Sequence, residues 1–494
     1  MSRNARALVW LGIALGIGGA AIFFDLAGPS LYLDEGWTLH VGSLPLAALL
    51  HAVAHSDDHP PLFYLFSSAV QSALHWQAWD YRYLTAPFGL LTIVATWAVA
   101  RAIFGDTVAA IAALVVALEP SLVVWDRLFR MYVVLVALSA TGWWLLSVLQ
   151  ASAKKSALLL WLPYGAIAIA LPYLHYLGGL MLVCQALYAL TRPQRLWPAL
   201  GCAAASAIAF GPWIGVLREQ FAAGGLAVVG AHLRFDWLGL ARMTLAAGTP
   251  VAWLAGRAFD WLMSGAVAAI CIAGAWLGRR TLLPFWLLPA LVQPLAGFAL
   301  HKSLALPHYL LYVVPAFAIA VALVASTLFA TRARLVGAAL VAGALAVNVA
   351  ALADVLFVPF YQFSDWYQVN ALLLSRETAG DRIILDQGFE RFIVGSFSAF
   401  RGHPMFSLDT PAGLPAALRW IDAEPNRRLW YVENQWFFPD PERRVFDRLE
   451  RTRRRLGAWE QRRESAADAV VVVLYGPRLR PAGRTKRVVT TTSP

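Results

Sequence analysis

The sequence predicts a mainly α-helical protein that crosses a membrane many times and carries a small α/β domain at its C-terminal end. Of its 494 residues, 59% are hydrophobic and only 14% are charged, and the mean hydropathy is +0.60. These values exclude an ordinary soluble globular protein. Separate apolar runs of about 20 residues match the thickness of a bilayer core, and the composition turns polar after Phe357.

The first apolar run covers residues 8–28 and follows Arg3 and Arg6. Positive residues beside a membrane helix mark its cytoplasmic end. The run lacks a small-residue cleavage motif, and many apolar runs follow it, so we interpret it as a retained helix and not as a signal peptide. The N-terminus is therefore predicted to be cytoplasmic, and the acidic residues after the run are predicted to emerge on the outer side.

Ten further apolar runs are interpreted as membrane helices. They are residues 84–104, 108–125, 132–150, 158–173, 177–190, 197–217, 258–277, 282–300, 309–329 and 335–357. A long outer loop, residues 218–257, separates the first six of these runs from the last four. With the first run, the sequence predicts about eleven transmembrane helices.

The segment 62–79 is ambiguous, because it is apolar but carries Gln71, His75 and Gln77 in its second half. If it does not cross the membrane, the basic clusters that follow all fall on the cytoplasmic side, as the positive-inside rule requires. Those clusters contain Arg101, Lys154, Lys155, Arg192, Arg195, Arg279, Arg280, Arg332 and Arg334. We therefore predict a juxtamembrane helix that lies against the outer face.

The C-terminal part, residues 358–480, contains apolar runs that are too short to span a membrane. The predicted strands are residues 382–385, 429–432 and 469–475. Residues 439–456 are predicted to form a charged amphipathic helix. We expect an extracytoplasmic α/β domain here, after a membrane domain of residues 1–357, and a disordered Thr-rich tail over residues 481–494.

The charge and the cysteines exclude two other classes of protein. The net charge is +11, but the basic residues cluster between apolar runs, where membrane topology explains them, so no nucleic acid partner is expected. Cys184, Cys202 and Cys271 all lie inside apolar runs, which favours small core residues over a disulfide framework. No internal repeat suggests a transporter of inverted symmetry.

The pair Asp34 and Glu35 directly follows the first membrane helix. One interpretation is that it caps a following helix over residues 36–54. The other is a catalytic carboxylate pair, because ionisable groups near membrane depth are costly unless they are used. A second polar motif, Asp57-Asp58-His59-Pro60-Pro61, is likewise compatible with an ordinary helix start, since proline lacks an N–H group that the first turn does not need.

A third polar motif opens the fourth membrane helix and contains Asp126, Arg127, Arg130 and Tyr132. It is predicted on the same outer face, where arginines run against the positive-inside trend. They either pair with Asp126 and reach lipid headgroups or form a phosphate site. The guanidinium group suits phosphate because its parallel N–H groups bind two oxygens at once.

The order of these motifs resembles glycosyltransferase family 39. The resemblance rests on Asp34-Glu35, His59-Pro60-Pro61-Leu62 and Arg130-Met131-Tyr132, and it is strongest over the first 180 residues. Also similar are Tyr173-Leu174-His175-Tyr176-Leu177-Gly178, Pro307-His308-Tyr309-Leu310-Leu311, Asp365-Trp366 and Gly380-Asp381. The family includes protein O-mannosyltransferases and the aminoarabinose transferases that modify lipid A, and the richness in Ala, Leu and Arg suggests a bacterial member.

The resemblance implies a GT-C fold and an inverting transfer of a sugar, mannose or similar, from a polyprenyl phosphate. The acceptor would be a lipid, glycan or protein on the outer side of the inner or plasma membrane. Asp34 matches the catalytic base, and Glu35 would adjust its charge or bind the acceptor. The residues expected to bind donor phosphate or substrate are His59, Arg82, Asp126, Arg127, Arg130, Tyr132, His175, Tyr176, His308 and Tyr309.

The sequence departs from the family pattern at two positions. Leu128 stands where many relatives have a glutamate, and His308 stands where many have an arginine. The resemblance also implies that a divalent metal could bind Asp58 and His59, but two adjacent ligands do not form a cage. No other cofactor is expected.

Two other functions compete with the transferase. A transporter or flippase of polyprenyl-linked sugars would also need outward cationic residues, but the absence of repeats and the carboxylates on one face argue against it. A non-catalytic envelope assembly protein would require that Asp34 be dispensable. The sequence does not identify the sugar, the acceptor or the polyprenol.

Overall fold

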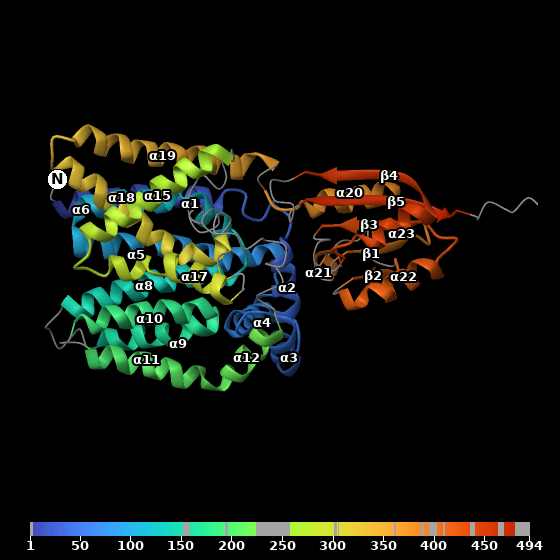
Figure 1. The fold of residues 1–494 in the computed structure, drawn as a ribbon, viewed down its shortest axis with the longest axis horizontal. Coiled ribbons are helices and arrows are strands. Elements are labelled where there is room, and N and C mark those ends of the chain that lie inside the picture. Colours follow the sequence, from blue (N-terminus) through green and yellow to red (C-terminus); the bar gives the residue numbers. More distant parts are fainter. Residues whose placement is uncertain are drawn as a thin grey trace, which may run out of the picture. The chain divides into compact units, whose positions relative to one another are not determined.

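The computed structural model divides the chain into two compact units, Met1–Gln362 and Phe363–Pro494 (Figure 1). The described residues are 3–151, 159–192, 196–223, 257–300, 304, 306–359, 362–386, 390–394, 403–408, 411–434, 440–462 and 469–479. Most of the predicted outer loop 218–257 and the whole predicted tail 481–494 lie outside them.

The first unit is built from helices. They are α1 (Arg3–Phe23), α2 (Leu33–Gly42), α3 (Leu46–Ser56), α4 (Leu62–Leu74), η1 (Ala78–Tyr81), α5 (Arg82–Phe104), α6 (Asp106–Leu118), α7 (Pro120–Asp126), α8 (Met131–Ala151), α9 (Trp161–Leu174), α10 (Tyr176–Leu190), α11 (Leu196–Phe210), η4 (Gly211–Trp213), α12 (Ile214–Ala223), α15 (Arg257–Leu277), α16 (Leu283–Leu287), α17 (Pro289–Leu300), η6 (Pro307–Val313), α18 (Val314–Phe329) and α19 (Arg334–Phe357).

This unit has the helices of a multi-pass membrane protein. Among the described residues, seven helices are long and apolar enough to cross a membrane, or eight if α6 and α7 form one span. That pair bends by 59° between Leu118 and Pro120, where proline cannot donate the backbone hydrogen bond that continues a helix. The other three predicted spans coincide with shorter apolar helices, namely α9, α10 and the described part of α15.

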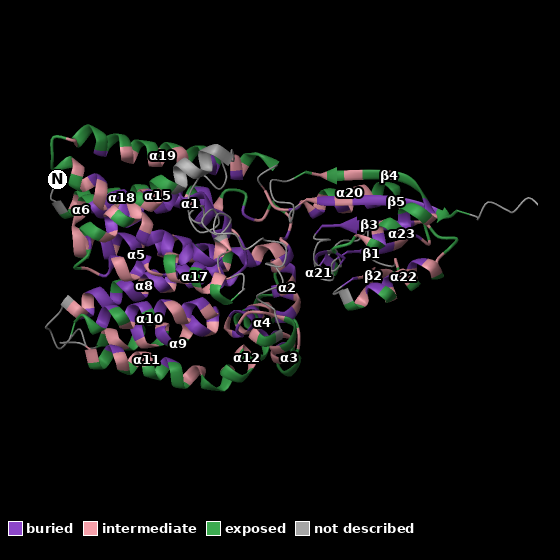
Figure 2. Cartoon of the chain, in the orientation of Figure 1, coloured by how far each residue is buried: buried purple, intermediate pink, exposed green. Residues whose placement is uncertain are grey.

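The packing of the bundle separates inner from outer helices. α5 lies between α6 and α8, and α6 also packs against α1 and α18. α8 is mostly buried, whereas α11 and α19 bury few of their residues (Figure 2). Apolar side chains on an exposed face suit contact with lipid chains.

The region between α1 and α5 contains the helices that carry the acidic motifs. α2, α3 and α4 gather near one end of the bundle, with α12 beside them (Figure 1). α4 has 13 residues and is about 20 Å long, shorter than a hydrocarbon core of about 30 Å. This length is compatible with the predicted juxtamembrane position.

The single helix expected over residues 36–54 is wrong. α2 begins earlier, at Leu33, and the chain turns through Ser43 before α3 begins at Leu46. Pro45 stands at the break, where its missing N–H group prevents a continuous helix. Asp34 and Glu35 therefore lie in the first turn of α2.

The second unit is an α/β domain with a five-stranded sheet of order β2-β1-β3-β5-β4. The strands are β1 (Arg382–Leu385), β2 (Met405–Ser407), β3 (Leu429–Glu433), β4 (Arg453–Gln461) and β5 (Val470–Arg478). β1, β2 and β3 are parallel, and β5 is antiparallel to β3 and β4. The helices are α20 (Trp366–Arg376), α21 (Glu390–Val394), η9 (Pro411–Gly413), α22 (Leu414–Ala423) and α23 (Arg444–Thr452).

The sequence predicted three of the five strands, because those strands are apolar. The predicted helix 439–456 is wrong at its end: α23 stops at Thr452, and Arg453 begins β4. β4 lies at the edge of the sheet and is largely exposed, so its charged residues conceal the strand from a hydropathy argument. Packed side chains of α22, α23 and the sheet form the core, including Ile384, Tyr431 and Leu449.

Candidate functional site

Asp34 is the exposed carboxylate at the N-terminus of α2. Its side chain is 38% exposed, and its Oδ2 lies 3.4 Å from Nη2 of Arg130. The N-terminus of a helix carries unpaired N–H groups and a partial positive charge, both of which favour an ionised carboxylate. The residue is therefore accessible and beside a cation, as a general base for an acceptor hydroxyl must be.

Glu35 is fully buried and has no free lone pair directed at solvent. It accepts hydrogen bonds from Nε and Nη2 of Arg82, at 2.8 and 2.6 Å, from the Phe129 amide at 2.8 Å and from the Tyr32 amide at 3.0 Å. Arg82 also donates to carbonyl oxygens of the α1–α2 connection, those of Leu26, Pro29 and Ser30. The pair ties this connection to α5 and to the start of α8, so its geometry supports a positioning role.

Arg127 and Asp126 are adjacent in sequence, but their side chains contact different parts of the protein. Arg127 donates to four carbonyl oxygens around the C-terminal end of α1, where a cation complements the helix dipole; these belong to Ala21, Ile22, Phe24 and Asp25. Asp126 is buried against Gly89 of α5, where an added Cβ would come within 2.5 Å of Oδ2. In the described parts of the chain no ion pair joins the two residues. Their contacts favour structural roles over donor binding.

Arg130 is a buried cation next to Asp34. Its Nη1 donates to Oγ1 of Thr38 at 2.7 Å, to the Asp34 carbonyl at 3.3 Å and to the Tyr64 hydroxyl at 3.4 Å. Its Nε finds no hydrogen-bond partner in the described part of the chain. Thr38 and Asp34 belong to α2, and Tyr64 belongs to α4, so this arginine connects both helices with the start of α8.

Asp57 is a site residue whose importance the sequence argument missed. Its carboxylate accepts from the Asp58 amide at 2.7 Å, the His59 amide at 2.9 Å, and His59 Nδ1 at 2.7 Å, and also from Trp37 Nε1 and the Tyr64 hydroxyl. Burial alone would raise its pKa, but His59, Tyr64 and the charge of Arg130 together lower the pKa to about 2. An aspartate side chain commonly accepts a hydrogen bond from the backbone amide two residues later, as Asp57 does from His59. This pattern in the sequence could have identified Asp57.

Imidazole and phenol rings from four parts of the chain meet beside Arg130. His59 Nε2 lies 3.3 Å from the Tyr132 hydroxyl. Ring centroids are 5.2 Å apart for His59 and His175, 4.9 Å for Tyr132 and His308, and 5.1 Å for His175 and Tyr309. The structure thus brings together the residues predicted after α3, in α8, between α9 and α10, and in η6. This grouping is a ring cluster of His59, Tyr132, His175, His308 and Tyr309.

His175 and Tyr176 are adjacent in sequence but make different contacts. His175 is buried, its Nδ1 accepts from the Leu177 amide at 3.2 Å, and its Nε2 has no partner among the described residues. The Tyr176 hydroxyl instead contacts Gln220 of α12 and accepts from Trp213 at 3.0 Å. Tyr176 therefore joins α10 to α12 and is not part of the ring cluster.

Asp58 and His59, the two residues predicted to bind a divalent metal, do not complete a metal site by themselves. His59 has its Nδ1 occupied by Asp57, and Asp58 is next to it in the chain. Within the ranges that the structure describes, no group of three His, Cys, Asp or Glu side chains is placed to hold a metal ion. A zinc site normally has three or four protein ligands, whereas Mg²⁺ is commonly bound by one or two carboxylates together with substrate phosphates.

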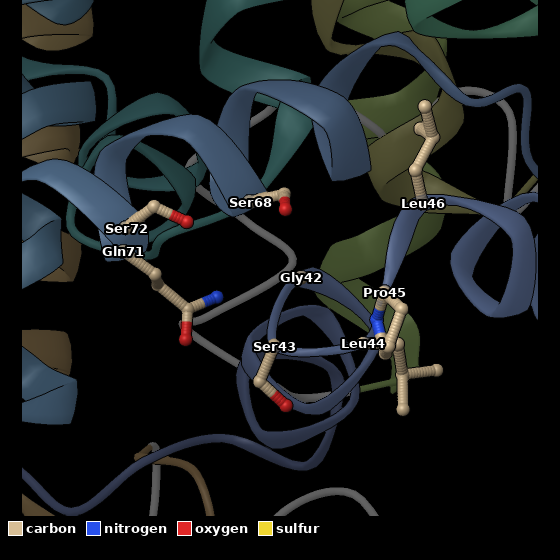
Figure 3. A pocket seen from close by; sticks show the side chains of 8 residues that line it. All are labelled: Gly42, Ser43, Leu44, Pro45, Leu46, Ser68, Gln71 and Ser72. Atoms are coloured by element: carbon tan, nitrogen blue, oxygen red, sulfur yellow. The ribbon is translucent and has the colours of Figure 1, made fainter.

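A separate pocket lies at the other end of α2 (Figure 3). Ser43 and the backbone that leads into α3 face Ser68, Gln71 and Ser72 of α4. The Gln71 side chain donates to the Leu39 carbonyl at 3.1 Å, which holds α4 against α2. None of the site residues expected from the sequence lines this pocket.

Comparisons with known proteins agree with the sequence motifs. The family model described as dolichyl-phosphate-mannose-protein mannosyltransferase matches residues 58–215. No curated protein sequence is significantly similar to the chain. The resemblance to glycosyltransferase family 39 is thereby confirmed over the matched segment.

Solved structures confirm the fold. ArnT from Cupriavidus metallidurans in the apo state has a TM-score of 0.54 and 15% identity, and the match covers 95% of this chain and 98% of that one. The same protein bound to undecaprenyl phosphate has a TM-score of 0.52 and 15% identity, with 96% and 98% covered. The Archaeoglobus fulgidus oligosaccharyltransferase AglB, in complex with an inhibitory peptide and a dolichol-phosphate, has a TM-score of 0.51 and 11% identity, with 92% and 73% covered. The chain has a GT-C fold, and the family match and the fold together support a glycosyltransferase.

Proposed function

We propose that the protein transfers a sugar from a polyprenyl phosphate to an acceptor on the outer side of the membrane, with inversion at the anomeric carbon. The observation that carries this proposal is the pairing of an exposed carboxylate, Asp34, with a buried cation, Arg130, at 3.4 Å. The family description names a dolichyl-phosphate-mannose donor, and the two similar structures above hold undecaprenyl phosphate and dolichol-phosphate. Mannose or a similar sugar is therefore the proposed cargo.

The reaction needs one base and one group that stabilises the leaving phosphate. Asp34 accepts the proton of the acceptor, whose freed lone pair attacks the anomeric carbon while the bond from that carbon to the phosphate oxygen breaks. The electron pair leaves with the polyprenyl phosphate. Arg130 stabilises the charge that develops on it, which is the role that preorganised cations play in other transfer reactions, and His59 is a second hydrogen-bonding group for the phosphate. Arrival from opposite the leaving group inverts the carbon.

The remaining rings of the cluster would enclose the donor headgroup. Tyr132, His175 and Tyr309 are buried and His308 is partly buried, and the Tyr132 hydroxyl lies 3.3 Å from Nε2 of His59. Imidazole and phenol groups supply hydrogen bonds to phosphate or sugar hydroxyls. Glu35 and Arg82 are not proposed to contact the substrate. Their hydrogen bonds hold α2 and the start of α8 in place.

The proposed orientation puts the N-terminus in the cytoplasm and the second unit outside it, in an inner or plasma membrane. Arg101 supports this orientation, since it pairs with Asp106 at 2.9 Å and contacts Asn4 at 2.8 Å, which places basic residues near the N-terminal end of α1. Reporter fusions after residues 105 and 359 test it. The fusion after residue 105 is expected on the cytoplasmic side, and the fusion after residue 359 on the outer side.

The deciding experiment is transfer of radiolabelled sugar in membranes that contain the wild type or Asp34→Asn, with a panel of polyprenyl-phosphate sugars. We expect a decrease of roughly 10²–10⁴-fold, because the base is lost while size is kept. Asp106→Asn is the matched control, since its carboxylate lies in the pair with Arg101. Equal transfer by wild type and Asp34→Asn would remove Asp34 as the base. No transfer from any donor would favour the transporter or assembly protein instead.

A divalent metal at Asp58 and His59 enters no step of this mechanism. The same assay tests it directly. Transfer that continues in the presence of EDTA supports the metal-free mechanism. Transfer that is lost with EDTA and restored by one divalent ion would require a metal site with ligands in addition to Asp58 and His59.

A further inference from the structure

The carboxylate of Asp57 lies at the meeting point of the candidate site. Its side chain is 4% exposed, and five donors surround it. They are the backbone amides of Asp58 and His59 and the side chains of His59, Trp37 and Tyr64. A buried carboxylate with this many donors is held in one orientation, so it in turn fixes the groups that donate to it.

One oxygen of Asp57 orients His59. Oδ1 accepts from His59 Nδ1 at 2.7 Å. Because an ionised carboxylate can only accept, Nδ1 must carry its proton, and this leaves Nε2 as the nitrogen directed at Tyr132, 3.3 Å away. This hydrogen bond sets the orientation of the imidazole ring and directs its Nε2 toward the ring cluster.

The other oxygen connects the two helices that carry the proposed machinery. Oδ2 accepts from the Tyr64 hydroxyl, and that hydroxyl also accepts from Arg130 Nη1 at 3.4 Å. Oδ2 also accepts from Trp37 Nε1. Trp37 follows Asp34 by three residues, so the two side chains lie on neighbouring positions of one helix face.

We infer that Asp57 is a positioning residue for the donor phosphate: it holds His59 directly, and Arg130 through Tyr64, in the geometry that binds the leaving group. This inference rests on the proposed function. It adds a residue outside the carboxylate pair and makes a prediction that a merely structural aspartate does not, namely that the effect of Asp57 depends on His59.

A double-mutant cycle tests this dependence. The full-length protein in lipid nanodiscs is titrated with undecaprenyl phosphate, and the Kd is measured for the wild type, Asp57→Asn, His59→Gln and the double variant. A hydrogen bond to a charged group gives an expected weakening of about tenfold for each single variant. Because Asp57 acts in part through His59, the double variant is expected to lose clearly less affinity than the hundredfold product of the two single losses.

Three further measurements keep the test sharp. Thermal unfolding reports whether Asp57→Asn folds. If it does not, Tyr64→Phe removes the hydrogen bond from the Tyr64 hydroxyl to Asp57, and we expect this variant also to have a higher Kd. Asp80→Asn is the matched control in the same outer segment, with an unchanged Kd expected. The rate at saturating donor should fall less than the affinity, because a positioning residue for the phosphate acts on binding.

The outcomes separate the two claims. If the wild type binds undecaprenyl phosphate and Asp57→Asn has the same Kd, the inference is overturned. It is also overturned if the losses of affinity in the double variant multiply to about a hundredfold. Absence of binding by the wild type overturns the proposed polyprenyl phosphate donor itself, and the role of Asp57 falls with it.

Discussion

Buried carboxylates have opposite charge states in the two units of the molecule. In the first unit, Asp57 is surrounded by N–H and O–H donors and lies near Arg130, and its pKa is about 2. In the second unit, Asp386 and Glu390 lie at the carboxyl end of β1 and at the start of α21, close enough for the charge of Asp386 to act on Glu390. Burial raises the pKa of both, and the charge of Glu433 raises them further.

The difference lies in the neighbours and not in the depth of burial. Asp386 accepts from the Asn434 amide at 3.0 Å, but its Oδ2 and both oxygens of Glu390 receive no bond from an amide, hydroxyl or cationic group of the described residues. Arg443, which could have neutralised them, donates to Glu433 at 2.7 and 2.6 Å. A buried carboxylate stays charged only where the fold supplies donors and cations, and otherwise it keeps its proton.

The largest expected loss of stability comes from removing the hydrogen-bond donors of the buried carboxylate of Glu35. Arg82→Gln leaves the fully buried Glu35 without the cation that binds both of its oxygens. We expect a loss of about 3–5 kcal/mol in the free energy of unfolding, because one partner of a buried pair remains charged and unpaired. Thermal unfolding of the detergent-solubilised protein measures it.

The control for this substitution is Arg101→Gln, which breaks the pair with Asp106 where both side chains are partly exposed, at 32% and 24%. A change below about 1 kcal/mol is expected there, since water replaces the partner. Equal destabilisation by the two substitutions would contradict the importance of burial in this comparison.

The second prediction concerns pH. A carboxyl group with a raised pKa in the folded state stabilises the fold at low pH, and that stabilisation is lost as the pH rises through the folded pKa. We therefore expect the second unit to lose stability from about pH 4 upward, by as much as about 1.4 kcal/mol per pH unit for each such group. Asp386→Asn, which keeps an acceptor for the Asn434 amide, should reduce this dependence.

Hydrogen exchange of β1 and β3 in the full chain, corrected for the intrinsic effect of pH, measures this prediction. The first unit supplies the contrast: the pKa of Asp57 is lowered, so its contribution is present above about pH 4 and is lost only as the pH falls through about 2. Wild-type protection of β1 that does not change between pH 5 and pH 8 would refute the assignment of a proton to the Asp386–Glu390 pair.

The smallest expected effects distinguish a half-buried ion pair from an exposed one within the second unit. Arg443→Met removes the cation from Glu433, whose side chain is only 5% exposed, and should cost about 1–2 kcal/mol. Arg444→Met breaks a pair with Glu442 in which the side chains are 58% and 67% exposed, and should cost less than about 0.5 kcal/mol. Chemical denaturation monitored by exchange in α23 ranks the two, and a reversed order would contradict it.

Much of the fold was predictable because its signals are local. Each apolar run becomes a helix on its own account, since a backbone inside a membrane must satisfy its own hydrogen bonds, and the strand at Arg382–Leu385 was found by its apolar run. β4 was not found, because its partner β5 and not its own composition makes it a strand. For the site, the motifs identified most residues of the ring cluster, but the contacts of Arg82 and Arg127 with α1 and the α1–α2 connection depend on residues far away in sequence.

The sequence by itself determined that acidic and basic motifs emerge together at one side of a helical membrane protein, because hydropathy and charge set the topology. Only the tertiary structure decided what each group does. Asp34 and Glu35 are neighbours with the same chemistry, yet successive residues of a helix point about 100° apart. That rotation leaves Asp34 exposed beside Arg130 and turns Glu35 fully inward onto Arg82. The physical reason is that a carboxylate's function is set by its surroundings, and those are assembled by the fold.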